Sequence, residues 1–306
     1  MLTFQMSQFF NLYERFQGTV FGEANQGLMP FLGVQFPKVR VCVIDTGIDM
    51  SHTAIFAGIK TGAIKEYRSW IGDPTDIHDS HGHGTHMVEL ILKSSENVDI
   101  FVAKIANKAN VPEKDIELIA DAINHANRVW KVDIITMSFG FKNRNAAVEA
   151  AIKEAAHSGK LMFAAASNGG NNNDRTYPAR DRNVICISAS NGKGKVGDIS
   201  PAAWGNDDNF MTLGISVPLL WKGNEVFKSG TSYATPIAVG FAINVLEICN
   251  FTRGSRMVKD GDDMRRVLKL LSVRDGDHDY IAPWVFLNNC KDFRYMVDSI
   301  ENVLQL

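Results

Sequence analysis

The chain has 306 residues, of which 45% are hydrophobic and 22% are charged, and its formal net charge is −2. This length is enough for one large α/β domain or two small ones, and the composition is typical of a soluble globular protein. The near-neutral charge argues against nucleic acid or a membrane as a partner, and no apolar run is as long as a membrane span.

The cysteines indicate a reducing environment. Cys42, Cys186, Cys249 and Cys290 form no Cys-x-x-Cys pair, so a zinc site is not expected. The first three lie in apolar segments, which favours reduced core residues. The N-terminus also lacks the basic start and apolar block of a secretory signal, so we expect a cytoplasmic, intracellular setting.

Residues 1–38 are expected to form an N-terminal extension that packs on the domain. Aromatic and aliphatic residues between positions 9 and 16 predict one short amphipathic helix, and Gly and Pro interrupt the pattern as far as Pro37. Residues 39–306 contain no repeat, low-complexity segment or linker, so we expect them to form a single domain that ends in helices.

The first strand is predicted at residues 39–44, a β-branched apolar run typical of a parallel strand buried on both faces. It ends at Asp45. Because α/β proteins place their chemistry at the carboxyl ends of such strands, Asp45 is a candidate functional carboxylate. For this residue alone, a helix cap or a turn aspartate is an equally good interpretation.

A histidine-rich segment follows the polar stretch 65–80, which is interpreted as a surface loop. Residues 81–86 are His-Gly-His-Gly-Thr-His, and an apolar helix is predicted to continue from them through Leu92. The spacing of the histidines is not a standard zinc set. The glycines indicate a close approach of the backbone to another group. His83, at the opening of the helix, is well placed to act as a base.

From residue 98 onward, strand and helix patterns alternate. Strands are predicted at 98–105, 132–137, 161–166 and 184–189, with helices at 112–130 and 145–157 between them. The alternation predicts βαβ units and a mainly parallel sheet. Two of these strands lead into polar segments, one at Ser138-Phe139-Gly140 and the other at Ser167-Asn168.

The segment Gly-Thr-Ser-Tyr-Ala-Thr-Pro at 230–236 follows a strand or hairpin predicted at 221–228. It places Ser232 at the start of a helix that is apolar nearly all round, and we expect such a helix in the middle of the domain. A serine at the positive end of a helix suits a nucleophile that must hold an oxyanion. In isolation the pattern fits an N-cap serine better. Further helices are predicted at 262–272 and 292–306, the last packing on its own domain.

Asp45, His83, Asn168 and Ser232 together supply the parts for acyl transfer through a covalent intermediate. Ser232 would attack a carbonyl, and His83 would take its proton and pass it to the leaving amine. Asp45 would orient the imidazole. Asn168 and the backbone N–H of Ser232 would donate hydrogen bonds to the oxyanion.

With these motifs the chain resembles the subtilisin-like serine peptidases, the subtilase or S8 family, and looks more like the intracellular fungal members than the secreted bacterial ones. The resemblance covers about residues 39–249, and the Asp, His, Ser order is the one known for subtilisin. It implies a doubly wound, three-layer α/β fold with helices on both faces of the sheet. It also implies a serine endopeptidase with the triad Asp45, His83 and Ser232 and the oxyanion residue Asn168. The motifs that carry it are Val-Ile-Asp-Thr-Gly at 43–47, His-Gly-Thr-His at 83–86, Ala-Ala-Ala-Ser-Asn at 164–168 and the segment 230–236.

The resemblance further implies that a peptide substrate binds as an added strand beside Ser138, Phe139 and Gly140. Thr176 stands before Tyr-Pro, at the position that floors the pocket for the side chain preceding the scissile bond, where glycine is usual. Threonine predicts a shallower pocket that disfavours the largest aromatic side chains.

Several positions depart from the family pattern. Ala54 stands where members with a high-affinity calcium site have Asp, and the helix after His86 has no calcium-loop insertion, so we expect no metal and no cofactor. Ser167 replaces the usual glycine, which would tighten the oxyanion region. Glu89 stands where small residues are common. Residues 1–38 are too short for a typical folding prodomain, so the chain either folds unaided or is the mature part of a larger protein with partner domains.

The remaining polar residues are given structural roles. His81 and His86 are expected to form local hydrogen bonds. The acidic segments at 207–208 and 260–263 could bind a cation, but solvated turns are the favoured interpretation. Five other histidines have no predicted partner and are expected at the surface: His52, His78, His125, His157 and His278.

Two alternatives to a peptidase stay open at this point. One is a catalytically silent interaction domain on the same fold. The other is a peptide ligase or cyclase that passes the acyl-enzyme to an amine instead of to water.

Overall fold

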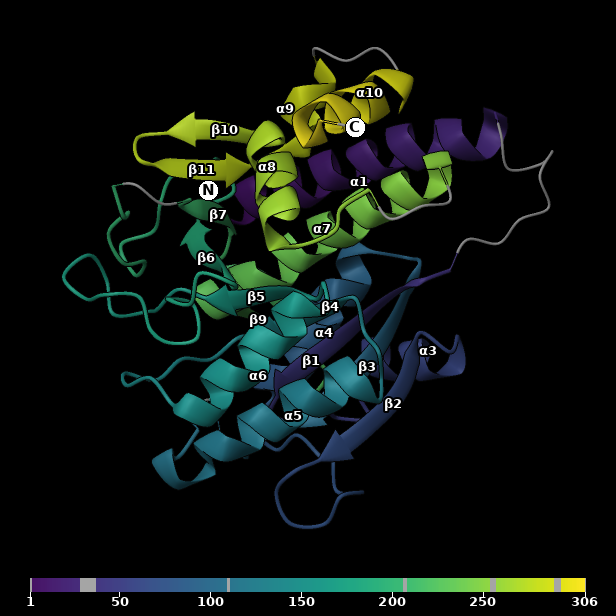
Figure 1. The fold of residues 1–306 in the computed structure, drawn as a ribbon. Coiled ribbons are helices and arrows are strands. Elements are labelled where there is room, and N and C mark those ends of the chain that lie inside the picture. The colour runs from purple at the N-terminus through teal and green to yellow at the C-terminus, as the bar shows by residue number, and fades with distance from the viewer. Residues whose placement is uncertain are drawn as a thin grey trace.

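The computed structural model describes residues 2–27, 37–108, 111–205, 208–253, 257–288 and 293–305. Its described strands form a nine-stranded sheet and a separate hairpin (Figure 1). The strands of the large sheet are β1 (Val39–Asp45), β2 (Ile64–Ser69), β3 (Val98–Lys104), β4 (Ile134–Met137), β5 (Leu161–Ala165), β6 (Ile185–Ser190), β7 (Phe210–Leu213), β10 (Ser272–Asp275) and β11 (His278–Ile281).

The strand order is β10-β11-β7-β6-β5-β4-β1-β3-β2, and every neighbouring pair is parallel except β10 and β11. The chain starts in the middle with β1, adds β2 and β3 on one side, and then builds outward from β4 on the other. This confirms the predicted doubly wound α/β fold. The carboxyl ends of β1 and β4 lie side by side, because Ile44 is in register with Met137. A switch of this kind is where open α/β sheets place their sites.

Helices cover both faces of the sheet (Figure 1). On β1, Cys42 and Ile44 pack with the helices of one face, while Val41 and Val43 pack with those of the other, as strand alternation requires. The helices are α1 (Leu2–Gly27), α3 (Thr53–Lys60), α4 (His83–Ser94), α5 (Ile116–Arg128), α6 (Ala146–His157), α7 (Thr231–Arg253), α8 (Gly261–Leu270), α9 (Pro283–Asn288) and α10 (Phe293–Leu304). Of these, α5 and α6 lie on the Cys42 face and α4, α7 and α8 on the Val41 face.

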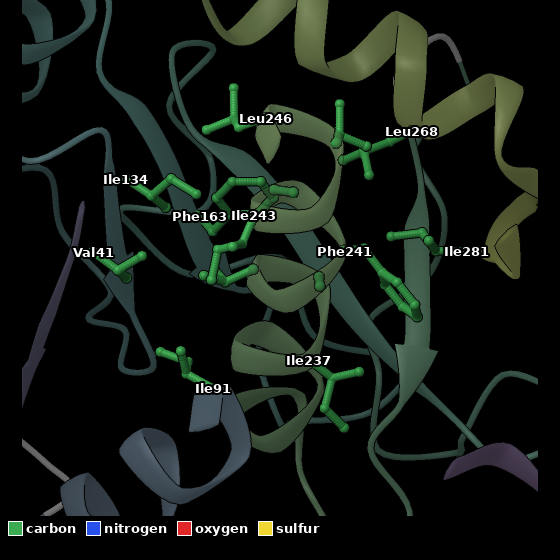
Figure 2. Close-up of a cluster of buried hydrophobic side chains, with 14 of the residues drawn as sticks. Val41, Ile91, Ile134, Phe163, Ile237, Phe241, Ile243, Leu246, Leu268 and Ile281 are labelled. Atoms are coloured by element: carbon green, nitrogen blue, oxygen red, sulfur yellow. The ribbon is translucent and has the colours of Figure 1, made fainter. Parts of the chain in front are cut away.

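Helix α7 is the centre of the larger core. Figure 2 shows its side chains Ile237 and Phe241 among residues of the sheet, with Ile91 of α4 and Leu268 of α8 close by. By length and composition the segment Thr231–Asn250 could cross a membrane, but 89% of its most apolar window is buried inside the domain. It therefore has the properties of the central core helix that the sequence predicts.

The N-terminal helix is longer than predicted. Helix α1 has 26 residues, where the sequence indicated one short helix around residues 9–16. It packs on the outer side of α7, since Phe9 and Tyr13 contact the ring of Phe241. The Tyr13 hydroxyl donates to the carbonyl oxygen of Ser94 at 2.7 Å and accepts from Asn244 Nδ2 at 2.6 Å. The proposed boundary between the extension and the domain at residue 38 stays a prediction.

Several short or exposed elements were also missed in the sequence. Strand β2 overlaps the segment 65–80 that was predicted to be a loop. It is an edge strand whose inner four residues are exposed, so its sequence has no apolar signal. Strands β7, β10 and β11 and helix α3 were also missed, being short elements of four to eight residues. The hairpin predicted at 221–228 is longer, with strands β8 (Val217–Trp221) and β9 (Asn224–Lys228).

The histidine prediction was wrong for two residues. His52 is 6% exposed and His278 is 7% exposed. His278 lies in β11 beside β7, and the Nε2 atom of His52 is 3.0 Å from the carbonyl oxygen of Leu220, so fold contacts distant in sequence bury both rings. His125 is half-buried against Trp130, whereas the rest of this group is exposed.

Two further expectations are confirmed. Cys42, Cys186 and Cys249 are buried and form no disulfide bond among the described residues, and Cys290 lies outside those residues. Helix α10 packs on its own domain, against α8, α1 and α7.

Candidate active site

Asp45 and His83 form a buried hydrogen-bonded pair. Asp45 ends β1, His83 begins α4, and the Nδ1 atom of His83 is 2.7 Å from Asp45 Oδ1. The two residues are 4% and 7% exposed. Since the carboxylate accepts, Nδ1 carries the proton and donates it, which leaves Nε2 unprotonated in the neutral ring. Asp45 therefore fixes the tautomer that a general base needs.

The electrostatic surroundings of His83 favour the imidazolium. Burial alone lowers the pKa of this ring, but the charge of Asp45, its hydrogen bond and the charge of Asp79 outweigh burial, so the pKa of His83 lies above the ordinary value of 6.5. A buried positive charge is thus stabilised at the position where a proton would be received.

Asp79 organises the segment around this pair, and sequence reasoning missed it. It is 1% exposed, and Oδ1 accepts hydrogen bonds from Thr46 Oγ1, His81 N and Gly82 N, while Oδ2 accepts from the backbone N–H and hydroxyl of Thr85. Asp79 thereby ties the residue after Asp45 to the first turn of α4. A signal was present in the sequence, because an Asp shortly before a helix start is a typical acceptor for free backbone amides.

Ser232 lies in the first turn of α7 and is 8% exposed. Its hydroxyl donates to the carbonyl oxygen of Ser138 at 2.9 Å, and the hydroxyl of Ser138 donates to the carbonyl oxygen of Ser232 at 3.0 Å. Pro236 explains why that carbonyl is available. It has no N–H to donate to the carbonyl four residues earlier, so the helix leaves the oxygen of Ser232 without its usual partner.

Asn168 follows β5 and is exposed. Its Oδ1 atom accepts from the backbone N–H of Thr231 at 2.8 Å and from the Thr231 hydroxyl at 3.1 Å. With the oxygen held in this way, the Nδ2 group is left to donate elsewhere. Asn168 is therefore fixed beside the start of α7 with its donor group available.

The nucleophile and the base candidates are neighbours, although their side chains are not hydrogen-bonded within the described residues. The ring of Tyr233, which follows Ser232, lies 5.8 Å from the ring of His83 between centroids. The Ser232 hydroxyl points to Ser138 instead, so it must turn to reach Nε2 of His83. The structure thus brings Asp45, His83, Ser232 and Asn168 to one place from four separate elements.

The predicted substrate-binding residues also lie together. A Cβ atom placed on Gly140 would come within 2.0 Å of Thr176 Oγ1, so the threonine side chain lies directly against this glycine. Phe141 and Tyr177 exchange backbone hydrogen bonds at 2.8 and 3.0 Å, which joins the two segments. The Phe139 side chain is buried in the core, so that residue can offer a ligand only its backbone.

No three His, Cys, Asp or Glu side chains gather as a metal site in the part of the chain that the structure describes. Ala54 lies in the first turn of α3, and α4 runs without interruption from His83 to Ser94. The expectation that the protein needs no cofactor stays a prediction.

Comparison with known proteins places the chain in a family. The model of the subtilase family matches residues 37–260. The chain is 31% identical over 257 residues to the subtilisin-like protease het-Q2 of Podospora anserina, which covers 69% of each protein. It is also 31% identical over 223 residues to the major intracellular serine protease of Bacillus subtilis (strain 168), which covers 68% of each.

A solved structure supports the fold. The protease domain of PatA aligns with a TM-score of 0.68 over 86% of this chain and 100% of that chain, at 20% identity. The resemblance that the motifs suggested is confirmed by the family model, by the relatives and by the fold. The chain therefore belongs to the subtilase family and is a subtilisin-like serine endopeptidase.

Proposed function

We propose that Ser232 is the nucleophile, His83 the general base and Asp45 the residue that orients His83. The observation that carries this assignment is the buried 2.7 Å hydrogen bond between Asp45 and His83, next to the segment that begins α7. Ser232 Oγ forms a bond to the scissile carbonyl carbon as its proton passes to His83 Nε2. The imidazolium then gives that proton to the leaving amine, and water releases the acyl group from Ser232 by the reverse sequence.

We further propose that Asn168 Nδ2 and the backbone N–H of Ser232 stabilise the oxyanion. Two features support this: Thr231 fixes Oδ1 of Asn168, and the first N–H groups of α7 have no partner within the helix. Donors that are fixed before the reaction need no reorganisation when negative charge develops. Ser167 accepts the N–H of Gly169 through its hydroxyl, which further restricts this turn.

The substrate is proposed to bind as an extended strand along Ser138, Phe139 and Gly140, whose backbone would pair with it. Thr176 lies against Gly140 and occupies space where a glycine would leave a deeper pocket. We therefore expect small or medium side chains before the scissile bond. A peptide library varied at that position tests this, and a preference for Phe or Tyr would rule it out. Thr176→Gly should widen the accepted range toward aromatic residues.

The assignment of the nucleophile and base is tested by labelling with a fluorophosphonate. Wild type should be labelled, whereas Ser232→Ala and His83→Ala should not be, and mass spectrometry should place the label on Ser232. Ser167→Ala, which changes a neighbouring hydroxyl outside the proposed triad, serves as the control and should still be labelled. Labelling that survives in Ser232→Ala would refute the assignment.

We propose that catalysis needs no metal ion, that the protein works in the cytoplasm, and that nucleic acid and membranes are not its partners. Ala54 at the position of a calcium ligand and the uninterrupted helix α4 support the first point. The three buried cysteines, which form no disulfide bond among the described residues, and the similarity to an intracellular protease support the cytoplasmic location. The net charge of −2 supports the proposal that nucleic acid and membranes are not partners. Peptidase activity should be unchanged by EDTA, and a loss that calcium restores would contradict the first point.

A further inference from the structure

One face of helix α4 is polar although most of the helix is buried. His83, His86, Glu89 and Lys93 follow one another at intervals of three or four residues, so they lie in a line along the helix. His83 begins this line at the candidate active site. The other three face the β8–β9 hairpin.

These three side chains bind the free edge of strand β8. Glu89 Oε2 accepts the backbone N–H of Leu220 at 3.3 Å, His86 Nε2 donates to the carbonyl oxygen of Leu220 at 3.2 Å, and Lys93 donates to the carbonyl oxygen of Pro218 at 3.4 Å. Strand β9 pairs with the other edge. Pro218 is tolerated at this edge because it has no N–H to satisfy. Helix α4 therefore takes the place of a neighbouring strand.

Glu89 is the central group of this contact. It is 0% exposed, its Oε1 atom is 2.7 Å from Lys93 Nζ, and its Oε2 atom is 3.5 Å from His52 Nε2. A buried carboxylate is unfavourable unless it is paired and hydrogen-bonded. An apolar residue would serve better if this position only filled space. The carboxylate is thus suited to holding the hairpin.

The hairpin connects the base to the nucleophile. At its tip the ring of Trp221 covers Gly82, where an added Cβ would lie 2.8 Å from the ring, immediately before His83. At its base Ser216 N donates to Ser229 Oγ at 2.8 Å, and Gly230 N donates to the carbonyl oxygen of Gly214 at 2.8 Å. Strand β9 ends at Lys228, and the chain enters α7 at Thr231.

We propose that Glu89 is a positioning residue for acyl transfer. It holds the β8–β9 hairpin against α4 and thereby sets the position of Ser232 relative to His83. This inference rests on the proposed roles of those two residues. Glu89 itself touches neither of them and takes no part in bond formation.

The test compares Glu89→Ala and Glu89→Gln with wild type. Glu154→Ala on α6, which removes an exposed ion pair with Arg128 of α5, is the matched control. Hydrolysis of a peptide arylamide, whose peptide part lies on the acyl side of the cleft, gives kcat and KM. Amide hydrogen exchange of residues 217–228 reports directly on the hairpin.

Glu89→Ala should lower kcat by roughly 10–100-fold, because small displacements of reacting groups have effects of this size. KM should stay within about twofold, since Glu89 binds Leu220, His52 and Lys93, none of which is a proposed substrate-binding residue. The Leu220 amide should lose protection. Glu89→Gln keeps an acceptor for that amide and should restore most of the protection and most of kcat.

A kcat of Glu89→Ala within about twofold of wild type would overturn the proposal, and so would a fall in kcat with unchanged hairpin exchange. If Glu89→Ala does not fold, Glu89→Gln and Lys93→Met carry the test. In these variants kcat and Leu220 exchange must change together, and a change in only one of them overturns the proposal. Failure of the proposed function would appear differently, because wild type would then neither be labelled at Ser232 nor hydrolyse the arylamide.

Discussion

The two faces of the sheet bury different kinds of side chain. On one face, α5 and α6 each turn an apolar stripe inward and a polar surface outward, and the buried side chains are mainly aliphatic. On the other face, α4 and α7 are buried on nearly all sides, and with them His83, Glu89, Thr231 and Ser232. Polar groups at such depth are stable only with fixed partners, and fixed partners also give them defined positions. The first face therefore mainly provides stability, and the second provides the chemistry.

Asp45→Asn should show the difference between the two faces most clearly, because it should change activity and leave stability nearly the same. The amide would favour the wrong tautomer of His83, so kcat should fall by about 10⁴-fold. Steady-state kinetics measures the loss, and urea unfolding should give a midpoint close to that of wild type. A loss of less than about tenfold would contradict the role assigned to Asp45.

The next largest effect is expected for Asn168→Ala. Removing one oxyanion donor should lower kcat by about 10²–10³-fold and leave KM nearly unchanged. Because Asn168 is exposed, the change leaves no cavity in the core, although Thr231 loses the acceptor Oδ1. Ser167→Ala is the neighbouring control, and an equal loss in that variant would show that the effect comes from the turn instead of the amide.

On the α5–α6 face, a substitution should lower stability and leave activity unchanged. Ile152 of α6 is 0% exposed, and Ile152→Ala should lower the free energy of unfolding by about 2–5 kcal/mol. Activity per folded molecule should stay the same, because this side chain does not contact the site. Urea unfolding and active-site titration measure the two quantities. Val129→Ala, at a position that is 61% exposed, should change stability by less than about 0.5 kcal/mol.

The pH dependence of activity should follow His83. Only the neutral imidazole can accept the proton of Ser232, so kcat/KM should rise with pH through the raised pKa of His83, with a midpoint above 6.5. A pH profile of arylamide hydrolysis measures this midpoint. In Asp45→Asn the midpoint should move down, and an unchanged midpoint would contradict the electrostatic role of Asp45.

The smallest effect concerns His86, which burial keeps neutral by lowering its pKa to about 4. Between pH 6.5 and 4 the unfolded chain binds a proton at this ring and the folded protein does not, so stability should fall as pH falls through this range. At pH 5 the low pKa of this ring lowers the free energy of unfolding by roughly 2 kcal/mol. Urea unfolding at pH 7.5 and pH 5 should show a smaller decrease in His86→Gln than in wild type, and equal decreases would contradict the assignment.

The contrast between the faces also explains how much the sequence could predict. The α5–α6 face was predictable because regular apolar spacing determines helices such as Ala146–His157, for which Asn145 and Gly159 also mark the ends. The motifs around Asp45, His83, Asn168 and Ser232 were recognisable because each follows a strong strand or precedes a strong helix. Edge strand β2 was not, because its side chains face solvent.

Buried polar contacts were the least predictable part of the site. Asp79 binds three backbone amides, which any residue type could supply, and two threonine hydroxyls, one of them 33 positions earlier in the sequence, so no local side-chain pattern marks its partners. The sequence marks Glu89 only as an unusual residue at its position, since its partner Leu220 is 131 positions away. His52 was expected at the surface for the same reason, because Leu220 lies 168 positions from it. Contacts of this range depend on topology, which single positions do not encode.

Helix α1 has a consequence for the order in which the enzyme matures on the ribosome. Tyr13 is held by Ser94 and by Asn244, which lies 231 positions further along the chain. At typical synthesis rates this interval takes about 10–50 s, during which the aromatic side of α1 has no α7 to cover it. Ser232 is synthesised shortly before Asn244, which lies 12 residues further along the chain. The nascent chain therefore acquires its nucleophile and the partner of its first helix almost together, so that no long-lived translation product combines an assembled triad with an uncovered α1.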